Sequence, residues 1–294
     1  MTSRVAVIAH RGKSLGGGLD ELRRMLHQRG LEPRWYEVTK SKKAPKYVRR
    51  ALDDGAELLF VWGGDGMVQR CAHEAAGTDV TLAIVPAGTA NLLAGNLGIP
   101  RDLEAAVAIG LAGTHRKLDL GTINGEHFAV MAGAGFDAAM IRDADAGLKD
   151  RIGRAAYVVT GAKHLRGSSV HAHIKIDGDD FFDGDISCVL AGNVGALFGG
   201  ITVFPEAKAD DGSLEVAVVT ATNLFEWSRV LLRTARSSPA DSPLVRVVPA
   251  RSVRVRFDRP VPYELDGGDR PPTDRLKIDV DPLAVSVCVP AVAA

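Results

Sequence analysis

A glycine-rich turn at residues 63–66 carries the clearest chemical signal in this sequence. The apolar run Leu58–Trp62 leads directly into Gly63, Gly64, Asp65 and Gly66, and a helical pattern follows. Glycines let the backbone turn tightly at a strand end and bring N–H groups close to phosphate oxygens, and the following helix start favours anions. The Asp65 carboxylate is suited to holding a magnesium ion or orienting a nucleotide. For the glycines alone, a purely structural turn is the alternative interpretation.

A second polar turn follows the next apolar run, which ends at Val85. Gly88 allows close approach of the backbone, and Thr89 and Asn91 supply a hydroxyl and an amide near a helix start. Either polar side chain could instead be an ordinary helix cap. Because parallel strands end at the same edge of a sheet, we expect the two turns to lie side by side. That arrangement favours one shared ligand over two independent caps.

The two turns belong to a region in which apolar strands and helical patterns alternate. We predict strands at Val5–Ala9, Glu32–Val38, Leu58–Trp62 and Thr81–Val85, and helices at Leu19–Arg29, Pro45–Asp53, Met67–Ala76 and Leu103–Leu111. This alternation predicts an α/β nucleotide-binding domain with a parallel sheet, whose ligands bind beyond the carboxyl ends of the strands.

The second half of the chain is predicted to be rich in β-strands. The expected strands are Val170–Asp177, Phe181–Ala191, Ser213–Val219, Ser252–Phe257, Val261–Leu265, Leu276–Val280 and Ala284–Val289, and two helices are expected at Ile152–Leu165 and Leu224–Arg236. We therefore predict two domains, residues 1–120 and 121–294, with the last strand a candidate to return to the first domain. A substrate is expected in the cleft between them.

Composition narrows the classes of function. The chain has 294 residues, 36 Lys and Arg against 36 Asp and Glu, and so no net charge that would favour nucleic-acid binding. Residues 1–50 nevertheless hold thirteen basic and four acidic residues. This excess is either a solvated surface or a landing surface for an anionic ligand or membrane.

Three features of the sequence predict a cytoplasmic protein. There is no apolar run of the roughly 18 residues that a transmembrane helix needs. The N-terminal run Val5–Ala9 is too short for the core of a signal peptide. Cys71, Cys188 and Cys288 are widely spaced and odd in number, which predicts reduced thiols buried in the core.

Six stretches, in this order, resemble the diacylglycerol kinase catalytic-domain family, the bacterial lipid kinases related to eukaryotic diacylglycerol and sphingosine kinases. They are GGDG at 63–66, PAGTANLLAGNLGIP at 86–100, LDLGTING at 118–125, GAGFDA at 133–138, PEAKADDGSL at 205–214 and YELDGG at 263–268. The resemblance covers nearly the whole chain. It implies ATP-dependent phosphorylation of a lipid hydroxyl such as that of diacylglycerol, on an α/β nucleotide domain joined to a β-sandwich domain. It also implies a peripheral location at the inner face of the membrane and a homodimer.

The resemblance assigns residues to the binding of ATP and Mg²⁺. The residues expected to bind the nucleotide are Lys13, Thr39, Gly63, Gly64, Asp65, Gly66, Met67, Gln69, Gly88, Thr89 and Asn91. In the family, the segment matching Lys208, Asp211 and Ser213 holds a structural magnesium largely through backbone oxygens, which suits a hard cation. From the residues alone, an ordinary turn at 210–212 is the alternative.

Asp266 occupies the aspartate of the family's DGE motif, where an acidic residue helps to remove the proton from the attacking hydroxyl. Asp65 and Asp266 are therefore the expected catalytic residues. Gly268 stands where the family has the glutamate of that motif, and the nearest carboxylates are Glu264, Asp266 and Asp269. Without the resemblance, Asp266–Gly267 would be interpreted as a hairpin turn.

Further departures from the family pattern define two alternative functions. Met67 replaces a common Thr, Leu92 an Asp, Gly95 an Arg, and Ala9–His10 an Asn-Pro pair. One alternative is a catalytically impaired lipid- or nucleotide-binding protein that retains the kinase fold. The other is a kinase of a soluble substrate, such as an NAD kinase, which shares the GGDG motif.

Overall fold

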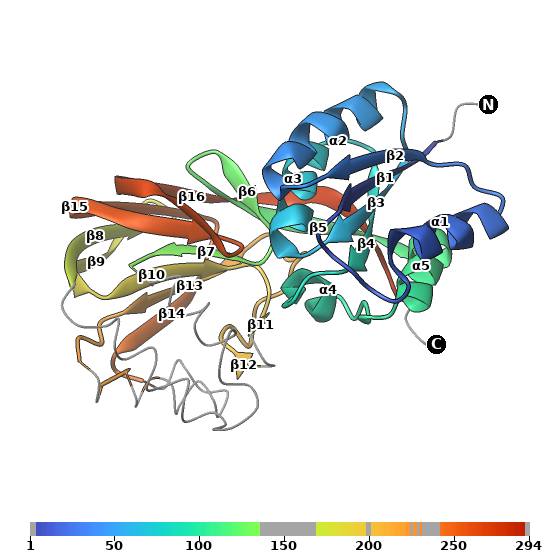
Figure 1. Cartoon of the computed structure of the whole chain (residues 1–294). Coiled ribbons are helices and arrows are strands. Elements are labelled where there is room, and N and C mark those ends of the chain that lie inside the picture. The colour runs from blue at the N-terminus through green and yellow to red at the C-terminus, as the bar shows by residue number, and fades with distance from the viewer. Residues whose placement is uncertain are drawn as a thin grey trace.

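The computed structural model describes residues 4–135, 169–197, 201–223, 226–227, 230 and 242–291. The chain forms two lobes, an N-terminal α/β lobe and a C-terminal β-rich lobe (Figure 1). This arrangement confirms the predicted fold class.

A parallel sheet forms the centre of the N-terminal lobe. Its strands are β1 (Val5–His10), β2 (Arg34–Val38), β3 (Leu58–Gly63) and β4 (Thr81–Pro86), in the order β4-β3-β1-β2. β4 is buried along its whole length and β3 over all but its first residue. Burial on both faces explains why these strands are continuous apolar runs rather than alternating ones.

Helices cover both faces of this sheet. They are α1 (Gly18–Gln28), the short η1 (Ser41–Lys43), α2 (Ala44–Asp53), α3 (Asp65–Ala75), α4 (Leu92–Asn96) and α5 (Leu103–Ala112). α2 and α3 lie on one face and α1 and α5 on the other (Figure 1). The carboxyl ends of the strands point toward the C-terminal lobe.

The rest of the described chain adds strands that pair mainly antiparallel, and most of them lie in the C-terminal lobe. They are β5 (Thr114–Ile123), β6 (Glu126–Phe128), β7 (Met131–Ala134), β8 (Val170–Ile176), β9 (Asp179–Ile186), β10 (Cys188–Gly192), β11 (Ala196–Leu197), β12 (Ile201–Thr202), β13 (Leu214–Val219), β14 (Val245–Ala250), β15 (Ser252–Leu265) and β16 (Gly268–Val289). Residues of β8, β13 and β15 form a second hydrophobic core in this lobe, separate from that of the first. Alternate residues of β8 are buried, as expected for a strand with one face on a core.

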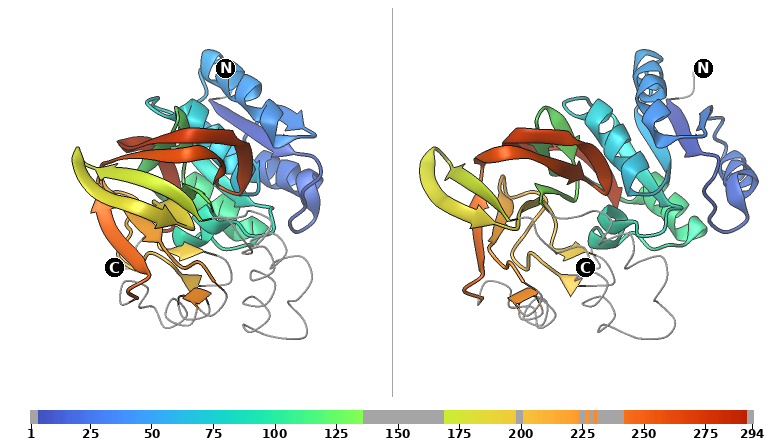
Figure 2. Two further views of the ribbon diagram at one scale, coloured as in Figure 1. Left: turned by 90° about the vertical axis from the view of Figure 1, so that its left-hand side faces the viewer. Right: turned by 60° about the vertical axis from the view of Figure 1, so that its left-hand side comes forward.

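β16 joins the two lobes. Its first half pairs with β15, its second half pairs with β5, and Ser286 and Val287 pair in parallel with Thr81 and Leu82 of β4. The hydroxyls of Thr81 and Ser286 are 3.1 Å apart. One sheet therefore runs from β2 in the first lobe to β14 in the second (Figure 2).

Several predicted elements differ from the structure. Phe181–Ala191 is not one strand, because the chain changes partners at Ser187, from β8 on one side to β7 and β13 on the other. The four last predicted strands are two long ones, β15 and β16. Eight elements were not predicted: the short helices η1 and α4 and the strands β5, β6, β7, β11, β12 and β14. The predicted helix Ile152–Leu165 and most of Leu224–Arg236 lie outside the described residues.

Candidate functional site

Four turns gather at the carboxyl edge of the parallel sheet. β1 leads to Lys13, β2 to Thr39, β3 to the Gly63–Gly66 turn and β4 to the Ala87–Asn91 turn. The side chains of Lys13 and Thr39 are exposed, and the Lys13 backbone is fixed by bonds to His10 O (3.1 Å) and from Trp62 Nε1 (3.1 Å). The topology thus brings together the polar turns that the sequence marks as one site.

The Gly63–Gly66 and Ala87–Asn91 turns are in direct contact, as predicted from their places in the sheet. A Cβ atom at Gly88 would lie 2.3 Å from Gly64 Cα and 2.6 Å from Asn91 Oδ1. Only glycine permits this approach. The close approach of the two backbones leaves no side chain between them at the edge.

Asn91 holds the second turn closed rather than capping α4. Its Oδ1 accepts a bond from Gly88 N (2.8 Å), and its Nδ2 donates to Pro86 O (3.2 Å) and Gly88 O (2.9 Å). It precedes α4 with φ of 53° and makes no side-chain cap there. The capping alternative therefore does not hold for Asn91, whereas the Thr89 side chain is exposed at the turn.

Asp65 belongs to the first turn and is the first residue of α3. Its Oδ1 accepts a bond from Leu93 N of α4 at 3.3 Å. Burial raises the pKa of Asp65 above its ordinary value, and nearby backbone N–H groups oppose that rise. The carboxylate is thus held between the starts of two helices, which favour an acidic group.

Asp266 is fixed by three consecutive backbone amides from the turn between β6 and β7. Its Oδ2 accepts from Ala129 N (2.7 Å), and its Oδ1 accepts from Val130 N (2.9 Å) and Met131 N (3.0 Å). Its own backbone has φ of 45°, and its N–H donates to Met131 O (2.9 Å). The carboxylate is therefore held rigidly, in a conformation that aspartate tolerates better than most residues.

The pKa of Asp266 responds to its burial and to the charge of Asp65 in the other lobe. Burial, with a further contribution from the charge of Asp65, raises the pKa of Asp266 to about 6, although the three amide bonds favour its ionised form. A carboxylate with a pKa near neutrality can accept a proton at pH 7 and later release it.

Met67 and Gln69, both expected to bind the nucleotide, are buried. The Met67 side chain lies where a Cβ atom on Gly63 would be, at 2.5 Å. The Gln69 Nε2 donates to His127 O at 2.6 Å, which attaches α3 to β6. Their roles toward a nucleotide stay predictions.

A half-buried network between α3 and β6 was not identified from the sequence. His73 Nδ1 lies 2.9 Å from His127 Nδ1, and His127 Nε2 lies 3.0 Å from Asp281 Oδ2. Arg270 pairs with Glu126 through two bonds, of 2.6 and 2.8 Å. These residues are far apart in the sequence and follow no motif, so no signal pointed to their meeting.

The predicted magnesium segment is an exposed turn before β13. Lys208 and Asp211 are exposed, and Asp211 Oδ1 accepts bonds from the backbone N and the Oγ of Ser213, both at 3.0 Å. Among the described residues, no three His, Cys, Asp or Glu side chains converge in a way that would hold a metal. A cation here would have to take backbone oxygens, which fits a hard ion such as Mg²⁺.

The surroundings of this turn are acidic and anchored to the sheet. The buried carboxylate of Asp119 accepts bonds from Gly212 N (2.7 Å) and from Leu283 N (2.7 Å) in β16. Burial, then the charges of Asp211 and Glu206, raises the pKa of Glu215. Arg116 pairs with Asp210 of the turn (2.8 Å), so part of this negative charge is neutralised, and Asp211, Glu206 and Glu215 supply the rest.

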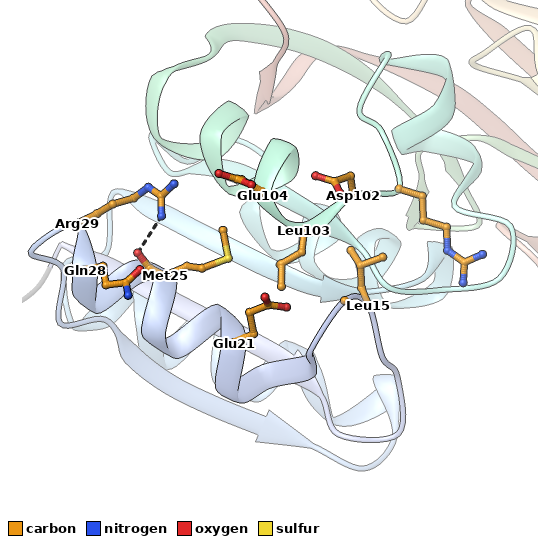
Figure 3. A pocket seen from close by; sticks show the side chains of 10 residues that line it. Leu15, Glu21, Met25, Gln28, Arg29, Asp102, Leu103 and Glu104 are labelled. Carbon is orange, nitrogen blue, oxygen red and sulfur yellow. Dashed lines mark hydrogen bonds between the residues drawn. The ribbon is translucent and has the colours of Figure 1, made fainter.

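A cavity of about 440 Å³ lies elsewhere, between α1 and α5 (Figure 3). Leu15, Met25 and Leu103 line it together with Glu21 and Arg29. No residue predicted to bind the nucleotide or the metal lines this cavity. The cavity is therefore not part of the candidate site, which lies at the carboxyl edge of the parallel sheet, where the lobes meet.

Cys71, Cys188 and Cys288 are all buried thiols, as predicted. Burial raises the pKa of each, that of Cys288 to about 11, so all three are protonated at neutral pH. No helix among the described residues has both the length and the apolar character required to cross a bilayer.

An α/β domain joined to a β-sandwich-like domain is the arrangement of the two kinase family models that match this chain. Residues 5–123 match the diacylglycerol kinase catalytic domain, and residues 130–289 match the YegS C-terminal NAD kinase beta sandwich-like domain. The chain belongs to the diacylglycerol kinase catalytic domain family, as its motifs predict.

Relatives agree with this assignment. The chain is 28% identical over 252 residues to the diacylglycerol kinase of Staphylococcus carnosus, covering 85% of this chain and 82% of that protein. It is 33% identical over 226 residues to a Pseudomonas syringae protein named "Probable lipid kinase YegS-like", covering 75% and 73%. The crystal structure of a diacylglycerol kinase from Bacillus anthracis superposes with a TM-score of 0.76 at 21% identity, covering 97% and 96%, which supports the fold.

Proposed function

We propose that this protein is an ATP- and Mg²⁺-dependent lipid kinase that transfers the γ-phosphate to a lipid hydroxyl such as that of diacylglycerol. The observation that carries the proposal is the contact of the two glycine turns at the edge of the parallel sheet, where Asp65 begins α3, together with Asp266, which three amides hold in the other lobe. This edge offers amides for phosphates, an acidic residue for a nucleotide-bound cation and a proton acceptor.

In the reaction, the acceptor hydroxyl oxygen forms a bond to the γ-phosphorus while the bond from that phosphorus to the β–γ bridging oxygen breaks. The hydroxyl proton passes to the Asp266 carboxylate, and ADP leaves. Because phosphoryl transfer depends mainly on positioning and charge neutralisation, one rigidly held carboxylate is sufficient as the acceptor. With a pKa of about 6, Asp266 is mostly ionised at pH 7.

Mg²⁺, when bound, would neutralise phosphate charge and hold the segment at Lys208, Asp211 and Ser213. Asp65 is the residue of this chain suited to the nucleotide-bound ion, since it stands at the phosphate edge. The backbone oxygens of the 208–213 turn suit a structural ion.

A membrane surface at the inner face of the bilayer supplies the acceptor in this proposal. Lys40, Lys42, Lys43 and Lys46 are exposed and follow Thr39 at the same edge of the sheet. Each basic residue near an anionic bilayer contributes about 1 kcal/mol to binding. A homodimer is a further expectation from the family, which sedimentation of the purified chain would test.

Transfer of labelled γ-phosphate is the test. The protein is incubated with ATP, Mg²⁺ and anionic mixed micelles that contain diacylglycerol, a sphingoid base or a total lipid extract, beside an Asp65→Asn control. We expect a labelled lipid that is absent with the control, and its identity names the acceptor. ATP binding without any labelled lipid would refute the proposal.

A catalytically impaired binding protein is the second candidate, and Gly268 favours it. The family glutamate is missing there, and a Cβ atom at this position would meet Arg270 Nη1 (3.0 Å), Leu265 O (3.3 Å) and Arg270 Cζ (4.0 Å). A Gly268→Glu variant therefore requires a small shift of Arg270, which Glu126 holds by two bonds. If the parent is inactive and this variant phosphorylates lipid, the chain is an impaired kinase. If the parent is active, the family glutamate is not required.

A further inference from the structure

Asn193 lies on the opposite side of the peptides that hold Asp266. It follows β10 and is 1% exposed. Its Nδ2 donates to Asp119 O (2.9 Å) and to Ala129 O (3.1 Å), and its backbone N donates to Val130 O (2.8 Å). No motif singled out this residue, and it does not contact the Asp266 carboxylate.

Asn193 and Asp266 bind the same two peptide groups, Ala129–Val130 and Val130–Met131, from opposite sides. In a planar trans peptide the C=O and the following N–H point in opposite directions. Ala129 O faces Asn193, so Val130 N–H faces Asp266; Val130 O faces Asn193, so Met131 N–H faces Asp266. Fixing the carbonyl oxygens therefore fixes the direction of the amides.

The orientation of the Asn193 side chain follows from its surroundings. Both groups that it meets are carbonyl oxygens, which only the NH₂ end of the amide can face. In the described part of the chain, its Oδ1 is buried without a hydrogen-bond partner. Burying an unsatisfied acceptor is unfavourable, so the contribution of the side chain lies in the two bonds of its Nδ2, while the bond to Val130 O is made by the backbone.

Asn193 is in turn anchored to the core. The Asp119 whose carbonyl it contacts is fully buried, and the Asp119 carboxylate accepts bonds from Gly212 N and Leu283 N. The Ala129–Met131 turn is buried as well. The contacts thus run without a break from the sheet to the Asp266 carboxylate.

We propose that Asn193 is a positioning residue, whose side chain holds Ala129 O and whose backbone N–H holds Val130 O, so that the Val130 and Met131 amides fix Asp266 at the site. The effect of Asn193 on turnover rests on the proposed kinase function, whereas its effect on the position and pKa of Asp266 does not. Losing amide bonds to a carboxylate disfavours its ionised form. Removing the Asn193 side chain should therefore make Asp266 titrate at a higher pH.

The test compares Asn193→Ala with the parent by ¹³C NMR titration of aspartate carboxyls, with the Asp266 signal assigned by its loss in Asp266→Asn. We expect the midpoint of Asp266 to rise by about half a pH unit to one unit. Ser187→Ala is the matched control, because it removes a buried bond to Val219 O (3.0 Å) in the same lobe without touching residues 129–131. It should destabilise the fold and leave the Asp266 midpoint unchanged.

Turnover gives a second readout. In Asn193→Ala, kcat at pH 7 should fall about tenfold and the acidic limb of its pH profile should move upward, with KM for ATP within about twofold of the parent, because the misplaced group is the proton acceptor. An unchanged midpoint and an unchanged pH profile in folded Asn193→Ala would overturn the proposal. A shifted midpoint in a parent that phosphorylates no lipid would refute the kinase function and leave the role of Asn193 standing.

A measurement on the unaltered chain covers the case in which the variant does not fold. The two Asn193 side-chain N–H protons, both bonded to buried carbonyls, should be protected from exchange with solvent. Asn193→Ser, which retains a hydroxyl donor, is the second variant and should shift the midpoint less than Asn193→Ala. Exchange as fast as that of an exposed asparagine would refute the contacts.

Discussion

A single methyl group added at Gly88 tests whether the contact between the two turns organises the site. The new Cβ would lie 2.3 Å from Gly64 Cα, whereas ordinary van der Waals contact begins at 3.4 Å, so the turns would have to separate by at least the difference, 1.1 Å. Neither neighbour can rotate away: one is backbone, and Asn91 Oδ1 is held by Gly88 N at 2.8 Å.

Two magnitudes follow for Gly88→Ala. Overpacking of a tight contact costs about 1–3 kcal/mol in the free energy of unfolding. A displacement of about 1 Å at a reacting centre lowers the rate by about a hundredfold. We therefore expect a lower midpoint in urea unfolding, weaker ATP binding by calorimetry and a hundredfold lower kcat/KM in lipid phosphorylation.

Gly95→Ala is the matched control. It adds the same methyl group in α4, a few residues away, where the new Cβ meets nothing within 4 Å. Replacing a glycine inside a helix by alanine stabilises by about 0.5–1 kcal/mol. If Gly88→Ala bound ATP and unfolded like Gly95→Ala, the turns would not need their contact and the reasoning would fail.

Three further predictions concern charge. Because Asp266 must be ionised to accept a proton, kcat should fall about tenfold per pH unit below about 6, and a flat profile between pH 7 and 5 would exclude it as the base. Burial, then the neighbouring His127, lowers the pKa of His73 below 6.5. As the pH falls, the unfolded chain therefore protonates at this histidine before the folded chain does, and the free energy of unfolding decreases. Between pH 7 and 5.5, urea unfolding should show a smaller decrease in stability for His73→Gln than for the parent. Arg270→Met leaves the partly buried Glu126 without its two bonds and should cost about 1–3 kcal/mol by urea unfolding, and an unchanged midpoint would show that the pair contributes nothing.

The gathering of the glycine turns at the edge of the parallel sheet could be predicted because it depends on short-range patterns in the sequence. A strand followed by a glycine turn can be recognised within ten residues, and parallel strands must end at one edge, so the approach of Gly64 to Gly88 follows from order alone. The strand pairing of the second lobe is less local. Ser187 separates β9 from β10 only because the two halves of one predicted strand pair with different strands, which their residue types do not encode.

The support of the site could not be predicted, for two reasons. The amides that hold Asp266 lie 135–137 residues earlier in the chain and are backbone groups, which leave no trace in residue type. On α3, the spacing of four residues puts Asp65, Gln69 and His73 on one face, but which of them meets the ligand and which meets β6 depends on tertiary packing. Gln69 donates to His127 O, and no sequence motif indicates this contact.

The strand β16 has a consequence for how the chain is made. Thr81 and Ser286, which pair across the two lobes, are 205 residues apart, so the ribosome finishes β4 long before its partner exists. Until then the edge of β4 is bare, and a bare edge is a template for wrong pairing. Contacts of such long sequence separation also slow folding, because loop closure precedes any gain from pairing. Expressed alone, the first lobe would keep the unpaired edge of β4 exposed. The two lobes should therefore be treated as one folding unit.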